Sequence, residues 1–93
     1  MTTTFFTILE LNGFTALKNG SFVWGVGSLV GGYSVKVKPL AIENGTRKYK
    51  VNIHHWQYDA DGELVIEEEK TKILFAGDAL AFIFQEVPQQ LWK

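Results

Sequence analysis

The chain contains no cysteine among its 93 residues, and this absence removes a whole class of chemistry. Disulfide bonds, thiolate metal sites and thiol catalysis are excluded. Because small secreted domains usually depend on disulfide bonds, the absence also favours a cytoplasmic location. The first residues, Met1 to Phe6, lack the basic start and the cleavage pattern of a signal peptide, which supports the same expectation.

Long apolar runs and an excess of charge of one sign are also missing. The longest apolar stretch, 22–33, is rich in glycine and shorter than the roughly 18 residues that a membrane helix needs. The net charge of −1 weighs against a dedicated nucleic-acid-binding protein and against an acidic mimic of DNA. With 46% hydrophobic and 20% charged residues, the composition is typical of a folded domain with one core. We therefore expect a single domain over residues 1–93, with no membrane span.

Alternation of apolar and polar side chains with a period of two dominates the sequence and predicts antiparallel strands. Residues 14–19 fit either a helical turn or the return arm of a hairpin. Pro39 donates no backbone hydrogen bond, so it predicts an edge position or a bulge. Residues 67–72 are polar on both faces, so they either lie on a sheet edge, where their charges discourage aggregation, or project beyond the core. Strands are expected at 3–11, 22–30, 33–42, 47–58 and 64–75.

Three groups of turn residues separate the expected strands. The pairs Gly31-Gly32 and Asn44-Gly45 suit two-residue hairpin turns, whose central residues need positive φ angles. The run from Asp59 to Gly62 suits a type I turn closed by a left-handed glycine.

After residue 77 the hydrophobic period changes to that of a helix. Apolar residues at 80, 83, 84 and 87 form one stripe, with Asp78 as the expected N-cap and Pro88 as the expected end. Leu91 and Trp92 are placed to anchor the tail. The predicted fold is α+β, mostly β: an antiparallel meander of about five strands with one C-terminal helix. We expect this helix to pack on the sheet face that carries Val35, Val37, Val51 and Ile53.

The glycine-rich stretch from Trp24 to Tyr33 superficially resembles a phosphate-binding loop. A phosphate loop, however, leads into a helix N-terminus, and here a strand pattern follows instead. The glycines are better explained by a bend, a bulge or the close approach of another backbone. An apolar pocket near this hairpin remains an alternative, and its candidate ligand-binding residues are Trp24, Gly25, Gly27 and Tyr33.

Candidate metal and catalytic sites are weak. His54 and His55 are adjacent on a strand and so point to opposite faces, which disfavours a shared metal ion. We expect a polar pair between His54 and Glu67 or Glu68 across the strands, and a half-buried His55. Asp59, Asp61 and Glu68 match part of a calcium loop, but no helices flank them. No serine lies in a nucleophile elbow, so we expect no catalytic residue, no metal, no cofactor and no enzyme activity.

One face of the expected strand 47–58 carries the best functional signal. It combines two lysines, a histidine and two aromatic residues, which are the residue types enriched where proteins dock. Open sheets in some RNA-binding proteins stack bases in this way, but their aromatic motifs are absent here. The candidate partner-binding residues are Lys48, Lys50, His54, Trp56 and Tyr58. The alternative is that helix or loop residues cover Trp56 and Tyr58 inside the protein.

The sequence therefore favours a non-enzymatic protein-binding module that acts as an inhibitor, an adaptor or a small subunit. Cysteine-free domains of this size with few motifs are common among accessory and phage-encoded proteins. The expected partner is another protein rather than a nucleic acid or a membrane, and an open sheet edge would also allow two copies to pair. The alternative function is a small-ligand carrier that uses the pocket near the glycine-rich hairpin.

Overall fold

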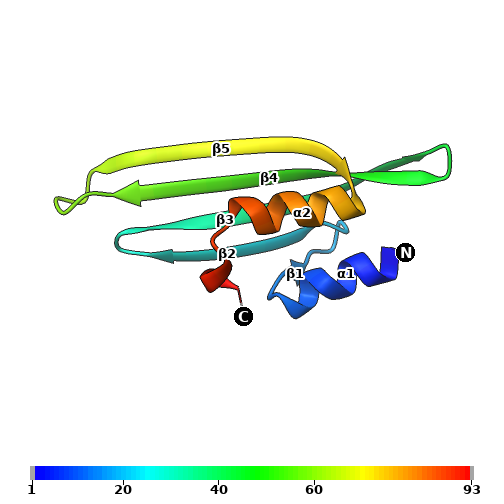
Figure 1. Ribbon diagram of the computed structural model, residues 1–93, viewed down its shortest axis with the longest axis horizontal. Coiled ribbons are helices and arrows are strands. Elements are labelled where there is room, and N and C mark those ends of the chain that lie inside the picture. Colours follow the sequence, from blue (N-terminus) through cyan, green and yellow to red (C-terminus); the bar gives the residue numbers. More distant parts are fainter. Residues whose placement is uncertain (1, 93) are drawn as a thin grey trace.

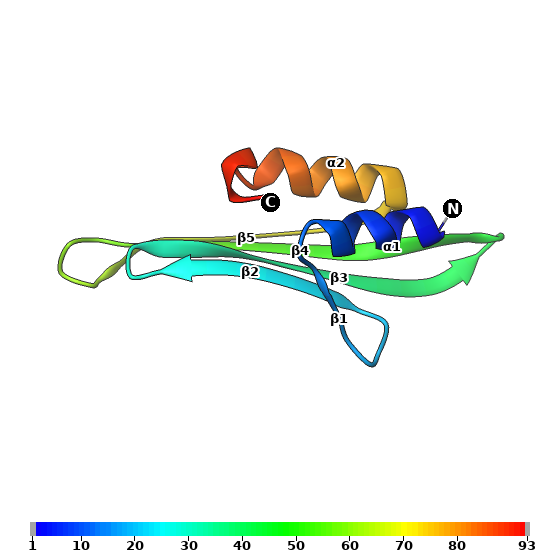
Figure 2. The same cartoon turned by 90° about the horizontal axis from the view of Figure 1, so that it is seen from below.

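One antiparallel sheet of five strands forms the body of the molecule in the computed structural model, which describes residues 2–92 and the side chains of 5–92 (Figure 1). The strands follow one another in the order β1-β2-β3-β4-β5, and both helices lie on one face of the sheet (Figure 2). The α+β, mostly β, fold class is thus confirmed. The elements are α1 (Thr2–Leu11), β1 (Thr15–Ala16), β2 (Phe22–Ser28), β3 (Gly31–Glu43), β4 (Thr46–Tyr58), β5 (Leu64–Phe75), α2 (Ala76–Glu86) and the 3-10 helix η1 (Gln89–Leu91).

The expected first strand, 3–11, is wrong, because these residues form α1. Phe5 and Leu9 are four residues apart, so they share a face in a helix as well as in a strand, and both are buried. Gly13, at φ 91°, closes the helix: its N–H donates to Glu10 O, and Phe14 N–H donates to Leu9 O. This is a Schellman C-cap, in which glycine adopts the left-handed conformation at low cost. The fifth strand is instead the two-residue β1, within the segment 14–19.

The turn between β2 and β3 lies two residues earlier in the sequence than expected. Leu29 and Val30 form it, and Gly31-Gly32 already belong to β3, with Gly31 opposite Ser28. The Ser28 hydroxyl accepts a hydrogen bond from Val30 N–H at 3.2 Å and stabilises this turn. The glycine pair is required for close packing rather than for the turn itself.

The other two turns are confirmed. Asn44 and Gly45 have φ angles of 53° and 75°, as a two-residue turn between β3 and β4 requires. At the far end of β4, Gly62 has φ 81° and donates its N–H to Asp59 O. The Asp59 carboxylate also accepts from the N–H groups of Asp61 and Glu63, both at 2.9 Å. The Asp59 side chain thus stabilises this turn through backbone N–H groups, as the turn interpretation of this segment requires.

In the part of the chain that the structure describes, Pro39 and the charged segment 67–72 both lie on backbone that has a neighbouring strand on one side only. The pairing of β3 with β4 shifts register between Pro39 and Ile42, so a bulge is confirmed. The pairing of β2 with β3 ends at Phe22 and Val37, so no strand within residues 2–92 pairs with Pro39 on that side. Strand β5 is the last in the sheet, which confirms the edge position expected for 67–72.

The C-terminal helix α2 is confirmed, but its start differs from the prediction. Its N-cap is Phe75 rather than Asp78, which lies in the first turn, where its charge favours the helix dipole. Pro88 follows the end of the helix as expected, because Val87 is already extended at φ −99° and ψ 128°. The buried stripe is also rotated relative to the expected one, since Leu80 is half-buried and Phe84 is exposed. The buried residues are Ala79, Phe82, Ile83 and Val87.

The hydrophobic core lies between the helices and one face of the sheet. Val35, Val37, Val51 and Ile53 point into it, which confirms the face expected for helix packing. Helix α1 adds Phe5, whose ring centroid lies 4.5 Å from that of Tyr49. We call this the covered face of the sheet, and its opposite the open face.

The C-terminal segment is anchored by aromatic packing, as expected for Leu91 and Trp92. The Trp92 indole lies 4.2 Å from Trp24 and 5.9 Å from Phe14, measured between ring centroids. Phe84 packs edge-on against the same indole at 5.3 Å. The cluster joins β2, α2 and the residue after η1 on the covered face.

Candidate functional site

The even-numbered residues of β4 present the open face, because successive side chains of a strand alternate between faces. The five partner-binding candidates, 48, 50, 54, 56 and 58, therefore share this face, while Tyr49, Val51 and Ile53 are buried on the other. In Figure 2 neither helix lies on this side of the sheet. The open face divides into a basic half and an aromatic half.

Four exposed lysines form the basic half, and we call them the basic cluster: Lys36, Lys38, Lys48 and Lys50. Lys38 is directly opposite Lys50 in the pairing of β3 with β4. A shallow groove of about 390 Å³ runs between three of them and is completed by Asn52 and Thr71. The Asn52 amide donates to the Thr71 hydroxyl at 2.8 Å, which fixes the floor of the groove.

The basic cluster has no acidic partner within residues 5–92. The ion pairs there involve His54, His55 and Lys70, and none of the four lysines. Lys48 lies over the ring of Phe75, with Nζ 5.2 Å from the ring centroid. Like charges directly opposite one another destabilise a sheet, so the Lys38–Lys50 pair costs stability in the isolated chain.

Trp56 dominates the aromatic half and explains two of the glycines. It is directly opposite Gly32, which in turn pairs with Gly27. A Cβ atom at Gly32 would lie 2.7 Å from Trp56 Cζ2, and one at Gly27 would lie 3.3 Å from it. The indole thus covers bare backbone on two neighbouring strands. Such aromatic cover compensates for the packing that strand glycines lack.

The remaining aromatic half surrounds a second groove. Trp56 and Tyr58 are half-buried, and they line a hollow of about 290 Å³ together with Ser34, His54, Leu64 and Glu67. The His54 ring lies 5.2 Å from the nearer Trp56 ring, centroid to centroid. This half therefore offers apolar surface together with hydrogen-bonding groups.

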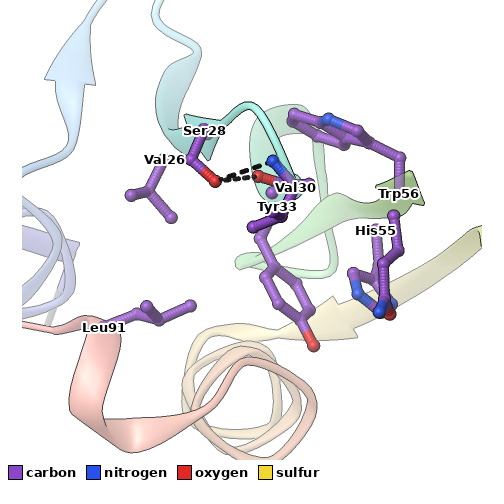
Figure 3. Close-up of a pocket in the computed structure, with 11 residues that line it drawn as sticks. Val26, Ser28, Val30, Tyr33, His55, Trp56 and Leu91 are labelled. Carbon is purple, nitrogen blue, oxygen red and sulfur yellow. Dashed lines mark hydrogen bonds between the residues drawn. The ribbon is translucent and has the colours of Figure 1, made fainter. Parts of the chain in front are cut away.

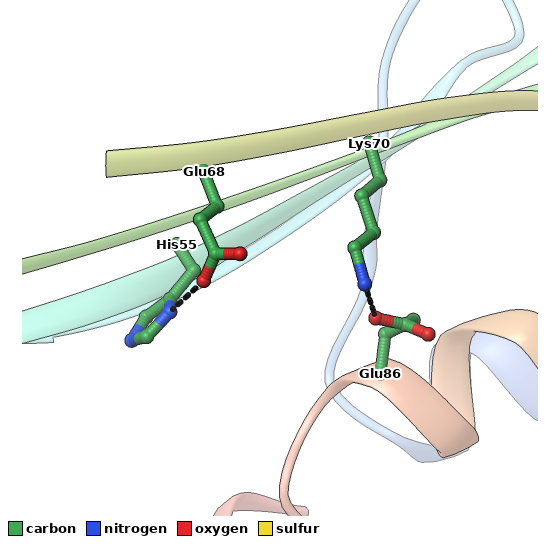
Figure 4. Close-up of polar contacts among 4 residues, drawn as sticks. All are labelled: His55, Glu68, Lys70 and Glu86. Carbon is green, nitrogen blue, oxygen red and sulfur yellow. Dashed lines mark hydrogen bonds and ion pairs between the residues drawn. The ribbon is translucent and has the colours of Figure 1, made fainter. Parts of the chain in front are cut away.

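The two histidines lie on opposite faces and each contacts a different glutamate. His54 Nε2 lies 3.1 Å from Glu67 Oε2 on the open face, which confirms the expected polar pair. On the covered face, His55 Nδ1 lies 3.7 Å from Glu68 Oε1 (Figure 4). The His55 ring is half-buried, as expected, and stacks on Tyr33 with centroids 4.2 Å apart. Among the described residues, no group of three or more His, Asp or Glu side chains is arranged to hold a metal ion.

The alternative ligand-binding residues are only partly brought together. Gly27 and Tyr33 line a largely apolar pocket of about 380 Å³ at the end of the β2–β3 hairpin (Figure 3). Leu91 reaches this pocket from the C-terminal segment, and Trp56 and His55 also contribute to its wall. Trp24 instead packs against Trp92, and Gly25 lies on the open face without a tight neighbour. These last two residues therefore lie outside the pocket.

Two residues of the basic cluster, Lys36 and Lys38, were absent from the candidates drawn from the sequence. Their alternation with Val35 and Val37 placed them on a polar face, and that signal was available. What linked them to β4 was the hairpin turn at Asn44-Gly45, which brings Lys38 opposite Lys50. The bulge after Pro39 shifts this register, and a sequence pattern does not fix the size of such a shift.

The comparisons with known proteins add no relative from which a function could be transferred. No helix within residues 2–92 is long and apolar enough to cross a membrane. No protein-family model, no curated protein sequence and no solved structure matches this chain.

Proposed function

We propose that the protein is a non-enzymatic binding module whose open face docks an acidic surface of another protein, as an inhibitor, an adaptor or a small subunit. The observation that carries this proposal is the basic cluster: four exposed lysines beside one another, without an acidic partner within residues 5–92. A carboxylate-bearing partner would relieve the mutual repulsion of the lysines. This relief favours binding, and the positive charge of the cluster selects an acidic partner.

The aromatic half supplies what lysines alone lack. Solvated charge pairs at the rim of an interface contribute little affinity, whereas aromatic residues near its centre contribute most. Trp56 and Tyr58 lie on the same face and the same strand as Lys48 and Lys50. The partner would therefore present acidic groups next to an apolar or aromatic side chain.

A protein fits this face better than a nucleic acid does. Part of the Trp56 ring already lies against Gly27 and Gly32, which reduces the ring surface that is free to stack on a base. Glu67 and Glu69 occupy the same open face near the aromatic half and would repel a phosphate backbone that follows the strands.

The decisive experiment compares the proteins that are captured by the wild-type chain with those captured by charge variants of it. Wild-type chain and the Lys38→Glu variant are used as baits in nuclease-treated extract of the native cell, and the captured proteins are quantified by mass spectrometry. Lys18→Glu is the matched control, since Lys18 is an exposed lysine in the loop between β1 and β2 and does not belong to the basic cluster. We expect an acidic protein that is captured by wild type and by Lys18→Glu but lost with Lys38→Glu.

The outcome separates the alternatives. Equal capture by all three baits would overturn the role of the basic cluster. Capture that is seen in a parallel untreated extract but is absent from the nuclease-treated one would assign the face to a nucleic acid instead. Trp56→Phe, which keeps an aromatic ring over the glycines, should weaken capture without abolishing the fold.

The pocket at the β2–β3 hairpin supports a second candidate function, a small-ligand carrier. Its lining is largely apolar, and the side chains of Ser28, Tyr33, His55 and Gln57 bring polar groups to it. Native mass spectrometry of freshly purified protein tests this candidate. A co-purifying small molecule that is lost in Gly27→Leu would support it, and a mass equal to that of the bare chain would count against it.

A further inference from the structure

The edge strand β5 carries a charge pattern that is complementary to itself. Its sequence, Leu64–Phe75, reads LVIEEEKTKILF: three apolar residues, three acidic residues, a Lys-Thr-Lys segment and three apolar residues. When such a strand is placed antiparallel to a second copy, acidic segment meets basic segment and apolar end meets apolar end. From this pattern we infer that β5 is a dimerisation strand, which pairs with β5 of a second copy of this chain.

The exposed edge supports this role. Strand β5 is the last strand of the sheet, and no helix or strand of residues 2–92 lies beyond it in Figure 1. Protected edges are usually short, carry proline, or are charged along their length. This edge is 12 residues long, contains no proline, and leaves apolar side chains in water at both ends. Val65 and Ile73 are each 55% exposed, and Phe75 is 46% exposed.

Symmetry restricts the pairing to a small set of registers. A two-fold axis perpendicular to the sheet relates two antiparallel copies of one edge strand, so both copies turn the same face upward. Opposed residues in an antiparallel pair also share a face. Each residue of one copy must therefore lie opposite a residue of the second copy that is on the same face of the sheet. This condition holds when the two-fold axis passes between one residue and the same residue of the second copy.

The register centred on Lys70 satisfies these conditions best. It places Glu68 opposite Lys72 and Ile66 opposite Leu74, and each of these pairs occurs twice because of the symmetry. Shifting the centre by one residue to Glu69 opposes Glu68 with Lys70, but it also opposes Glu69 with its own symmetry mate and Ile66 with Lys72. A shift of two residues, to Glu68, opposes Glu67 with Glu69, and a shift of one residue the other way, to Thr71, opposes Lys70 with Lys72. The register centred on Lys70 avoids each of these mismatches.

The central pair of this register, Lys70 with its symmetry mate, is already compensated within each chain. Lys70 Nζ lies 2.5 Å from Glu86 Oε1 of α2, as Figure 4 shows. Each lysine therefore brings its own carboxylate to the axis, on the covered face. The two glutamates compensate the like charges at the centre, and Glu68 and Lys72 form opposite-charge pairs on either side of it.

The dimer would also enlarge the proposed docking surface. Because the axis is perpendicular to the sheet, the two open faces lie side by side on the same surface of a ten-stranded sheet. Two basic clusters then point in one direction. The dimer itself does not depend on the proposed function, since none of the basic cluster belongs to β5.

Charge variants of β5 test the inference, with the full chain analysed by sedimentation velocity over a range of concentrations. We expect wild type to dimerise. Glu68→Lys places lysines opposite Lys72, and Lys72→Glu places glutamates opposite Glu68, so each variant alone should dimerise about tenfold more weakly or worse. Mixing the two variants restores opposite charges at both positions, and the mixture should form a heterodimer.

The mixing result cannot be explained by contacts within one chain. Glu68 contacts His55, and Lys72 Nζ lies 5.0 Å from the Phe82 ring centroid, so either substitution also changes the monomer. Mixing does not repair those contacts. Circular dichroism checks that each variant is folded, and Lys38→Glu, on the open face, is the matched control that should still dimerise. A wild-type chain that stays monomeric, or variants that dimerise as wild type does, would overturn the inference.

Cysteine substitution tests the register, because the chain has no cysteine of its own. Lys70→Cys places the two thiols opposite each other, and oxidation should link the dimer covalently. Glu67→Cys is the control: in this register the two thiols are six residues apart along the strands, about 20 Å, and should not be linked. Rapid linking of Glu67→Cys would exclude this register.

Discussion

The two faces of the sheet are built from alternate residues of the same strands, yet one face is buried under helices and the other is exposed to solvent. On the covered face, Val35, Val37 and Val51 are at most 1% exposed beneath two helices. On the open face, the residues between them include four lysines, which no helix within residues 2–92 covers. Backbone pairing is the same for both faces, so the side chains alone decide which face packs and which is presented to solvent.

The comparison separates residues that hold the fold from residues that are free to act. Substitutions on the covered face should reduce stability, whereas substitutions on the open face should reduce binding. Gly32 is the exception, because it is an open-face position that the packing of three strands requires. The predictions below test this division, from the largest expected effect to the smallest.

Gly32→Ala should be the strongest exception to this division, because it is an open-face substitution that we expect to reduce stability. The added Cβ would lie 2.2 Å from Val26 O and 2.7 Å from Gly27 Cα, which are backbone atoms that cannot rotate away. We expect the free energy of unfolding to fall by about 3 kcal/mol or more, measured by urea denaturation. Gly77→Ala is the control, since nothing lies near that position in α2, and the helix should gain about 1 kcal/mol. A Gly32→Ala variant as stable as wild type would contradict the packing of Trp56 over the hairpin.

Substitution by threonine at two neighbouring residues of β4 compares the faces directly. Val51→Thr buries a hydroxyl in an apolar site and should lower the free energy of unfolding by about 2 kcal/mol. Lys50→Thr changes an exposed residue and should stay within about 0.5 kcal/mol of wild type. Thermal denaturation of both variants measures the contrast. Similar losses at the two positions would mean that the open face is covered in solution.

Tyr49→Phe should stabilise the protein, because the Tyr49 hydroxyl is buried and has no hydrogen-bond partner within the described residues. The expected gain in free energy of unfolding is about 1 kcal/mol at neutral pH. A gain confined to high pH would point to a satisfied hydroxyl.

Tyr49→Phe should also alter the pH dependence of the free energy of unfolding. Burial raises the pKa of Tyr49 above its ordinary value of 10.0, and the nearby Arg47 charge opposes this only in part. Since the folded state holds the proton more tightly, stability is full below pH 10 and falls as the pH rises through the folded-state pKa. Urea denaturation at about pH 7 and about pH 11 should show a smaller fall for Tyr49→Phe than for wild type.

Lys38→Glu should give the smallest change in stability, and in the favourable direction. It replaces a like-charge pair across the strands with an opposite-charge pair, in which the new carboxylate faces Lys50, and should add about 0.5 kcal/mol at low salt. The same variant is expected to lose its acidic partner. A protein that becomes more stable while it loses binding would show that the open face is shaped by something other than folding. A loss of stability would contradict the cross-strand proximity of Lys38 and Lys50.

Much of the architecture could be predicted because its signals are local. The turns at Asn44-Gly45 and Asp59–Gly62, the edge strand and the end of α2 at Pro88 each follow from the conformation that a few residues favour. The first element could not be predicted in the same way, because the spacing of Phe5 and Leu9 fits both a strand and a helix. Gly13 as a C-cap was the signal for the helix, but Asn12-Gly13 equally suits a hairpin turn.

The sequence by itself determined the alternation of faces, the main strands, and the polar character of the face that carries the site candidates. Alternation is a property of one strand, so no tertiary information is needed to read it. Only the tertiary structure decided which distant residues meet. It set Lys38 opposite Lys50, Trp56 over Gly27 and Gly32, and Trp24 against Trp92 rather than at a pocket mouth. Those contacts depend on register, and register is fixed by the packing of the whole sheet against its helices.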